Sequence, residues 1–227
     1  MPRASTAFLF DLDGTLVDSV YQHVLAWKEA LDREGVYLSV WRIHRKIGMS
    51  GGLFANILLR ETGLDITGER LERLRRYHAE AYNRQAGLRA VQPLPGAREL
   101  LAHLTEQGMP WGIATSGRME TAAHNLEALG VDPARVPVIT RDLVRHAKPD
   151  PDLFIAAAEK LGVDIGRALV VGDSIWDMLA AQRARALGVG LLSGGYGQEE
   201  LERAGAFRVY EDPADLLRHI DEVAARG

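Results

Sequence analysis

Two aspartates separated by one residue follow an apolar run near the start of the chain. Thr6–Phe10 is long enough for a buried strand, and Asp11 and Asp13 come directly after it. Residues i and i+2 of an extended chain point to the same side, so the two carboxylates are expected to share one site. Like charges held this close repel unless a cation or a proton relieves them. One carboxylate can attack an electrophile, while the other exchanges protons with the leaving group and with water.

The Asp-Leu-Asp-Gly sequence has two other interpretations. Asp and Gly are common in turns, and Gly14 lets the chain turn sharply, so a plain turn remains open. A calcium-binding EF-hand loop begins in the same way, but it requires a closing Glu at its twelfth position. Counted from Asp11, that position is Gln22, and the calcium interpretation fails.

A Thr-Ser-Gly sequence stands where another predicted strand passes into a helix. The strand spans Trp111–Thr115, and Ser116 and Gly117 lead into the predicted helix Arg118–Leu129. A threonine hydroxyl together with backbone N–H groups at the start of a helix can bind an anion. An ordinary helix N-cap is the alternative.

Lys148 and a second pair of aspartates occupy similar positions further along the chain. Lys148 precedes Pro149, so it is expected in extended geometry just before a helix. Asp173 follows a predicted strand, and Asp177 lies four residues later, which places both carboxylates on one face of a helix start. Compensation of the helix dipole is the plainer explanation for this pair.

All of these residues follow strands that alternate with helices, a pattern that runs from Pro95 to the end of the chain. Such alternation predicts an α/β fold with a parallel sheet covered by helices on both faces. Ligands bind to these sheets at the carboxyl ends of the strands, so Asp11, Thr115 and Asp173 are expected to meet at one rim. The predicted strands are Thr6–Phe10, Trp111–Thr115, Val136–Thr140, Ala168–Val171, Val189–Leu192 and Phe207–Val209, and the predicted helices are Ala97–Gln107, Arg118–Leu129, Asp152–Leu161, one that follows Ser174 and runs through Leu187, and Pro213–Ala225.

The segment between the first strand and this alternation is predicted to be helical. Its first helix carries Val20, Val24, Trp27 and Leu31 on one face and ends at Gly35. The predicted domains are a core formed by residues 1–17 and 92–227 and a helical cap formed by residues 18–91, which lies above the rim. The other cap helices are predicted over Ser39–Ile47, Leu53–Thr62 and Thr67–Ala86, the last with solvated arginines, and a linker is predicted over Val91–Gly96.

A basic cluster precedes a glycine-rich loop within the predicted cap. Arg45 belongs to the cluster, and Ser50 and Gly51 belong to the loop, which leads into the next helix. Basic side chains beside a helix start can attract an anion, and a plain surface loop is the alternative. The Gly-Lys-Ser/Thr ending of a P-loop is missing, which excludes that motif.

Composition narrows the function classes. The chain has 227 residues, 47% of them hydrophobic, which is typical of a globular protein with ample core. Its formal net charge of -4 argues against a nucleic-acid-binding surface, and no apolar run approaches membrane-spanning length. The apolar stretch at the N-terminus is too short for a secretory signal, so a cytoplasmic location is expected. With no cysteine, disulfides and thiolate sites are excluded.

Four sequence strings, in order and at predicted strand ends, resemble the signatures of the haloacid dehalogenase superfamily. They are Phe-Asp-Leu-Asp-Gly-Thr from Phe10, the Thr115 position, Lys-Pro-Asp-Pro-Asp-Leu-Phe from Lys148, and Gly-Asp-Ser-Ile-Trp-Asp from Gly172. The helical insertion after the first string is similar to the class with a small helical cap, the phosphoglycolate phosphatase and β-phosphoglucomutase group. His23 also lies in a stretch that resembles this group, where this histidine is near the site.

This resemblance implies a Rossmann-like core and a phosphatase that acts on a small phosphorylated metabolite, such as a sugar phosphate or phosphoglycolate. Asp11 would attack phosphorus and form an aspartyl-phosphate, and Asp13 would act as general acid and then as general base. Thr115 and Lys148 would neutralise the phosphoryl oxygens. Mg²⁺ is implied as cofactor, since the ligands would be oxygens from Asp11, Asp13 (through its backbone carbonyl), Asp173 and Asp177.

The predicted partners and substrate contacts combine this resemblance with the composition and the basic cluster. The partner is expected to be the phosphorylated metabolite, with no nucleic acid or membrane, and the protein is expected to be a monomer or homodimer. The candidate substrate-binding residues are Thr115, Ser116, Gly117, Arg118, His23, Arg45, Ser50 and Gly51.

Three other functions remain possible for a protein with this fold. A phosphoglucomutase is the main alternative, although relatives of that kind typically carry an Arg where this chain has Gly51 and an acid where it has Gly172. A haloacid dehalogenase lacks the second aspartate, so Asp13 argues against it. A non-catalytic phosphate-binding module is the last alternative, because a fold does not fix a function.

Overall fold

A six-stranded parallel sheet forms the centre of the protein. The computed structural model describes residues 6–49, 51–64, 67–88 and 90–224. Within these residues the strand order is β3-β2-β1-β4-β5-β6, which confirms the predicted α/β, Rossmann-like fold. The strands are β1 (Ala7–Phe10), β2 (Trp111–Ala114), β3 (Val138–Ile139), β4 (Ala168–Gly172), β5 (Leu187–Leu191) and β6 (Ala206–Tyr210).

Strand β1 is buried along its whole length between β2 and β4. Phe8 and Phe10 pack into the apolar cluster on one face of the sheet, while Ala7 and Leu9 pack into the cluster on the other face. This alternation follows from the two-residue period of a strand. Burial of each Phe side chain contributes about 1.5–3 kcal/mol to folding. The residues after Phe10 are therefore held at a fixed place in the middle of the sheet rim.

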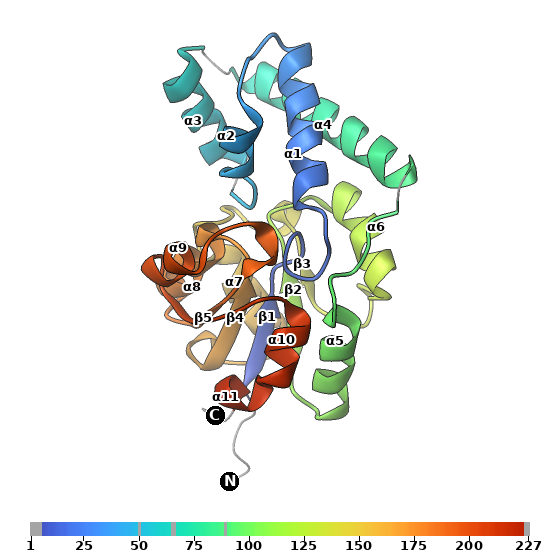
Figure 1. The fold of residues 1–227 in the computed structure, drawn as a ribbon, viewed down its shortest axis with the longest axis vertical. Coiled ribbons are helices and arrows are strands. Elements are labelled where there is room, and N and C mark those ends of the chain that lie inside the picture. The colour runs from blue at the N-terminus through green and yellow to red at the C-terminus, as the bar shows by residue number, and fades with distance from the viewer. Residues whose placement is uncertain (1–5, 50, 65–66, 89, 225–227) are drawn as a thin grey trace.

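Helices cover both faces of the sheet (Figure 1). The face that carries Phe8 and Phe10 packs against α5 (Ala97–Glu106), α6 (Met119–Leu129), α10 (Pro213–Arg218) and α11 (Ile220–Ala224). The opposite face packs against α7 (Asp152–Leu161) and α8 (Ile175–Ala184), and α9 (Gln198–Arg203) lies over β5 and β6.

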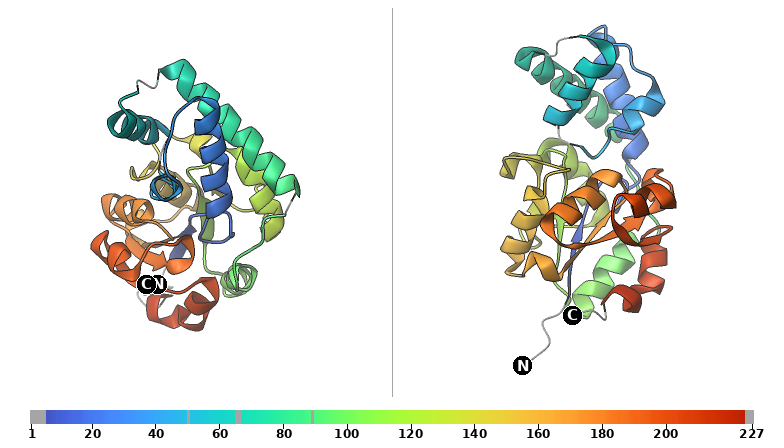
Figure 2. Two further views of the ribbon diagram at one scale, coloured as in Figure 1. Left: turned by 45° about the horizontal axis from the view of Figure 1, so that its top comes forward. Right: turned by 90° about the vertical axis from the view of Figure 1, so that its left-hand side faces the viewer.

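Four helices between β1 and α5 gather at one end of the molecule (Figures 1 and 2). They are α1 (Val20–Arg33), α2 (Val40–His44), α3 (Gly51–Thr62) and α4 (Gly68–Leu88), called the cap helices below. They share an apolar cluster of their own, which includes Val24, Leu31, Phe54 and Leu74. In the described part of the chain, no helix is long and apolar enough to span a bilayer.

The two segments that connect the cap helices to the sheet run side by side. The Asp18 N–H donates to the Gln92 carbonyl at 2.9 Å, and the Leu94 N–H donates to the Leu16 carbonyl at 2.9 Å. Both crossings are short and lie close together, so the sheet and the cap helices are joined through one narrow region.

The structure corrects three expectations about the elements. The helix after Ser174 ends at Ala184 and does not reach Leu187, because Arg185 adopts a φ of 60° and the chain then enters β5. The predicted closing helix Pro213–Ala225 is two helices with a break at His219, and its last residue lies outside the described residues. The short helix α9 was not predicted.

Gly96 offers a test of how tightly α5 packs against α10. Gly96 has a φ of 74°, and a Cβ there would lie 2.4 Å from the Ala214 Cα. Gly96→Ala is expected to lower the free energy of unfolding by about 3 kcal/mol, because backbone strain and overpacking add.

Gly108→Ala is the matched control for this change. Its φ is 63°, but nothing lies within 4 Å of a Cβ at that position, so only about 1 kcal/mol is expected. Denaturant unfolding measures both, and equal losses would contradict the packing argument.

Candidate active site

A cavity of about 530 Å³ lies between the sheet rim and the cap helices. Its lining includes Asp11, Asp13, Thr115 and Ser116 from the rim and His23 from α1. The carboxyl ends of β1 and β2 therefore meet at one place, as parallel neighbours must.

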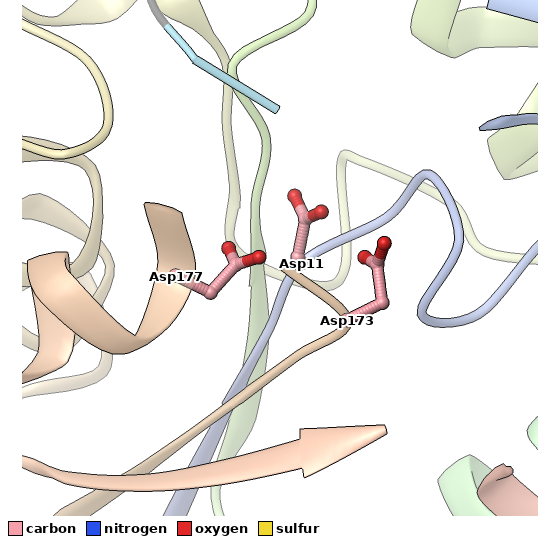
Figure 3. Close-up of side chains that lie close together, drawn as sticks. All are labelled: Asp11, Asp173 and Asp177. Atoms are coloured by element: carbon pink, nitrogen blue, oxygen red, sulfur yellow. The ribbon is translucent and has the colours of Figure 1, made fainter. Parts of the chain in front are cut away.

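A buried cluster of three carboxylates (Figure 3) includes Asp11, which lines the cavity. Asp11 follows β1, Asp173 follows β4, and Asp177 stands in the first turn of α8. Figure 3 shows Asp11 between the other two. Each residue offers one carboxylate oxygen, and these three oxygens all lie within 4.8 Å of one another. Three carboxylates this close repel strongly, so the cluster needs compensating positive charge.

Lys148 supplies part of that charge from a fully buried position. Its Nζ contacts Asp11 Oδ1 and lies 2.7 Å from Asp177 Oδ1. Burial by itself would lower the pKa of Lys148, but Asp11 and Asp177 outweigh that effect and raise the pKa. The side chain is therefore a permanent ammonium beneath the carboxylates.

One ammonium does not balance the cluster. Burial raises the pKa of Asp11 to about 7, because Lys148 offsets only part of the desolvation and Asp177 and Asp13 add to it. Burial, Asp177 and Asp11 likewise raise the pKa of Asp173 well above its usual value. A divalent cation among these oxygens would favour the ionised forms, and carboxylate oxygens are the ligands that hard cations prefer.

Local hydrogen bonds and small residues hold the cluster in place. The Ser174 N–H and hydroxyl donate to Asp177 Oδ2 at 3.1 and 2.5 Å, and the Thr15 hydroxyl donates to Asp173 Oδ1 at 2.8 Å. A Cβ at Gly194 would lie 1.7 Å from Asp173 Oδ2, so glycine is required there for the carboxylate to fit. Asp177 thus both caps α8 and pairs with Lys148, and the dipole explanation accounts for only part of its role.

Asp13 is held by donors from several elements. The Ser19 hydroxyl, the His23 ring and the Asn125 amide all lie within 3.1 Å of Asp13 Oδ1. Burial would raise the pKa of Asp13, but the contacts with His23 and Ser19 outweigh it and lower the pKa. Thr115 lies on the other side, with its hydroxyl 3.5 Å from Asp13 Oδ2.

The Thr-Ser-Gly turn faces the cavity. The Thr115 hydroxyl accepts a hydrogen bond from the Gly117 N–H at 2.9 Å, and Gly117 and Arg118 both line the cavity. The Ser116 hydroxyl is buried and has no hydrogen-bond partner among the described residues. A buried hydroxyl without a partner is costly, so this atom fits a ligand oxygen that enters the cavity.

The structure does not place the residues expected from the basic cluster and its loop in the described cavity lining. Arg45 forms an ion pair with Glu200 and lies over the Tyr196 ring, and it is absent from the described cavity lining. Gly51 is the first residue of α3, and Ser50 lies outside the described residues. From this loop, Gly48 and Met49 line the cavity.

Several residues around the cavity were missed in the sequence. Arg75 and Arg76 belong to the run interpreted as solvated, yet both line the cavity, as does Trp27. Asn125 and Tyr82 are fully buried and hydrogen-bonded to each other at 2.8 Å. Asn125 did give a signal, because it is a polar residue on the apolar face of its helix.

Comparison with known proteins identifies the family. The family model of haloacid dehalogenase-like hydrolases matches residues 6–185. Hexitol phosphatase A of Escherichia coli K12 is 35% identical over 171 residues, 74% of either chain. A phosphoglycolate phosphatase of Rhodospirillum rubrum is 31% identical over 220 residues, 95% of this chain and 90% of that protein.

A solved structure of a hydrolase has the same fold. The crystal structure of a hydrolase from Pseudomonas syringae is 61% identical, covers 96% of this chain and 99% of its own, and superposes with a TM-score of 0.94. The chain belongs to the haloacid dehalogenase-like hydrolases, and the predicted family and enzyme class are confirmed.

Gly194 tests whether the carboxylate cluster binds a divalent cation. Gly194→Ala is expected to weaken Mg²⁺ binding at least 10-fold, because the new methyl group displaces the Asp173 carboxylate. Titration calorimetry of the folded variant with Mg²⁺ measures the effect.

Gly197→Ala, in the same loop, is the matched control. A Cβ there meets only Glu200 Oε2 at 3.6 Å, so Mg²⁺ affinity is expected to stay unchanged. Wild-type affinity in Gly194→Ala would rule out a cation site at Asp173.

Proposed function

We propose that the protein is a Mg²⁺-dependent phosphatase that hydrolyses a small phosphorylated metabolite through an aspartyl-phosphate, an acyl phosphate formed on Asp11. One observation carries the proposal: Asp11 lines the cavity while its Oδ1 contacts the buried Lys148 ammonium. This ion pair favours the ionised carboxylate that a nucleophile requires, and it fixes the direction of attack. The named phosphatases among the relatives support the same reaction.

Asp11 would attack phosphorus in line with the leaving oxygen. The P–O bond to the organic group breaks, and the new bond joins phosphorus to a carboxylate oxygen of Asp11. Water then attacks the phosphorus of this aspartyl-phosphate and releases inorganic phosphate and the free Asp11 carboxylate. In both steps the main catalytic requirement is to stabilise the negative charge on the three equatorial oxygens of the phosphoryl group.

Asp13 would move the protons in both steps. It gives a proton to the departing alkoxide and takes one from the attacking water. Its lowered pKa favours the carboxylate in the free enzyme, which is the form that a base needs. A phosphate dianion in the cavity adds negative charge beside Asp13 and shifts its pKa upward, toward the form that an acid needs.

The equatorial oxygens would be held by donors already in place. Lys148 provides the charge from its contact with Asp11, and the Thr115 and Ser116 hydroxyls, which face the cavity, provide hydrogen bonds. When bound, Mg²⁺ neutralises charge on the phosphoryl oxygens. The residues proposed to hold it are Asp11, Asp173 and Asp177, with Asp13 through its backbone carbonyl.

The organic part of the substrate would occupy the cap side of the cavity. The side chains there are polar and aromatic, such as His23 and Trp27 from α1, together with apolar ones such as Met49, and Arg118 lines the cavity from the core side, just before α6. This lining fits a polyol or a small hydroxy acid, in keeping with the hexitol phosphatase and phosphoglycolate phosphatase named among the relatives. We retain His23 and Arg118, which line the cavity, as substrate contacts and leave out Arg45, which is absent from the described lining and pairs with Glu200.

The predicted division into domains fits this arrangement. Residues 18–91 would move as a cap on the core formed by 1–17 and 92–227, because both connections cross at Leu16–Asp18 and Gln92–Leu94. Closure would exclude water from the cavity. A cytoplasmic location, a monomeric or homodimeric state and the lack of a nucleic-acid partner stay predictions.

A phosphoglucomutase remains the alternative, and the structure weighs against it. A Cβ at Gly172 would lie 2.3 Å from Asp177 Cβ, so an acidic side chain at this position would have to displace Asp177 and its contact with Lys148. This chain therefore fits the phosphatase better.

Asp11→Asn tests the nucleophile. The neutral amide cannot attack phosphorus, so turnover is expected to fall at least 10⁴-fold while the thermal unfolding temperature stays within a few degrees. Asp18→Asn is the control, because Asp18 is exposed and outside the described cavity lining. Undiminished activity in Asp11→Asn would contradict the assignment.

A substrate panel with Mg²⁺ and with chelator tests the reaction itself. Released phosphate is measured with hexitol phosphates, phosphoglycolate, nucleotides, β-glucose 1-phosphate and 4-nitrophenyl phosphate. Phosphate release that chelator abolishes is expected. Glucose 6-phosphate formed without free phosphate would support the mutase instead.

A further inference from the structure

We propose that Asn125 and Tyr82 are positioning residues that hold Asp13 so that one defined oxygen, Oδ2, carries the proton to the leaving group. The inference rests on the proposed function, because it assigns the orientation of the acid in that reaction. It concerns residues outside the four sequence strings, one on α6 of the core and one on α4 of the cap helices.

The two oxygens of Asp13 have different surroundings. Oδ1 is contacted by Ser19 Oγ at 2.6 Å, by Asn125 Nδ2 at 2.6 Å and by His23 Nε2 at 3.1 Å. Oδ2 has one contact in the described part of the chain, the Thr115 hydroxyl at 3.5 Å. Donors that saturate Oδ1 leave Oδ2 as the oxygen free to bind a proton.

Tyr82 decides which way the Asn125 amide points. The Tyr82 hydroxyl donates to Asn125 Oδ1 at 2.8 Å, so the amide nitrogen is the atom left to face Asp13. Both side chains are fully buried, and neither can exchange these bonds for water. Without the hydroxyl, the amide oxygen loses its buried donor, and the Asp13 contact alone holds the amide nitrogen in place.

The Tyr82 ring has a second, separable contact. It stacks on the His23 ring with centroids 4.0 Å apart and planes 4° apart, and His23 in turn reaches Asp13. His78 lies 3.1 Å from the other nitrogen of His23. Removal of the hydroxyl alone therefore tests its hydrogen bonds to Asn125 and Ser19, both of which contact Asp13, and leaves the stacking on His23.

This arrangement ties the acid to the position of the cap helices. The bond from Tyr82 to Asn125 crosses from α4 to α6, and the contact from His23 crosses from α1 to the rim. Asp13 is fully held only when the cap helices sit as they do here. Proton transfer would thus depend on a seated cap.

Leaving-group dependence tests the proposal. The variants are Tyr82→Phe, which keeps the ring, and Asn125→Leu, which keeps similar volume without a donor. The substrates are the alkyl phosphate that the wild-type enzyme hydrolyses fastest and 4-nitrophenyl phosphate, whose leaving group departs without a proton. The quantity compared is kcat/KM, which reports the steps up to transfer of the phosphoryl group to Asp11.

With the alkyl phosphate, kcat/KM is expected to fall about 10-fold in Tyr82→Phe and about 10²-fold in Asn125→Leu, because a misplaced acid loses part of the roughly 10²–10⁴-fold that general acid catalysis contributes. With 4-nitrophenyl phosphate, both variants are expected to stay within about threefold of wild type, because the acid is not needed in this step. A merely structural defect would lower kcat/KM equally for both substrates.

Tyr210→Phe is the matched control. Tyr210 is a buried tyrosine whose hydroxyl contacts Glu222 at 3.2 Å, away from the cavity. Loss of this hydroxyl is expected to leave kcat/KM unchanged for both substrates. Equal losses with both substrates in folded Tyr82→Phe, or wild-type kcat/KM with the alkyl phosphate, would overturn the proposal. A wild-type enzyme that hydrolyses neither substrate with Mg²⁺ would instead overturn the proposed function.

Discussion

The contact of Lys148 with Asp11 and Asp177 is the constraint on which the rest of the site depends. Charges removed from water are costly unless they are paired, and all three groups are buried. The pairing requires β1, the segment before α7 and the start of α8 to meet at one point, which the central place of β1 between β2 and β4 ensures. Loss of Lys148 would leave carboxylates buried without compensation. The excess negative charge that remains beside this lysine is what suits the cluster to a cation and the cavity to phosphate chemistry.

Two carboxylates separated by one residue acquire opposite tendencies from their surroundings. Burial and neighbouring carboxylates raise the pKa of Asp11 to about 7, while the contacts with His23 and Ser19 lower that of Asp13. Asp11 is bound to the rigid core, through the Asp11 N–H to the Val171 carbonyl at 2.8 Å and through Lys148. Asp13 is bound in part to the cap helices, through His23. In our proposal the nucleophile is therefore fixed, and the acid responds to the cap.

The sequence predicted the sheet, its covered faces and the four helices α1 to α4, because periodic burial leaves a local pattern. It also placed Asp11, Thr115 and Asp173 at strand ends, and parallel topology then brings them to one rim. Arg185 could not be foreseen as a helix end, since a non-glycine residue with positive φ has no strong local signature. Contacts between distant segments could not be predicted either, because the Arg45–Glu200 ion pair and the Asn125–Tyr82 hydrogen bond form only in the folded protein.

The most direct test of the account is to trap the phosphate on Asp11. In Asp13→Asn, which lacks the base that activates water, the phosphorylated enzyme should accumulate with 4-nitrophenyl phosphate, whose leaving group needs no acid. Acid quenching, borohydride reduction and peptide mass spectrometry would then read the modified carboxyl group as homoserine. We expect one equivalent of nitrophenol in a burst and homoserine at position 11. A burst of nitrophenol with Asp11 unmodified, or with another carboxylate modified, would contradict the account.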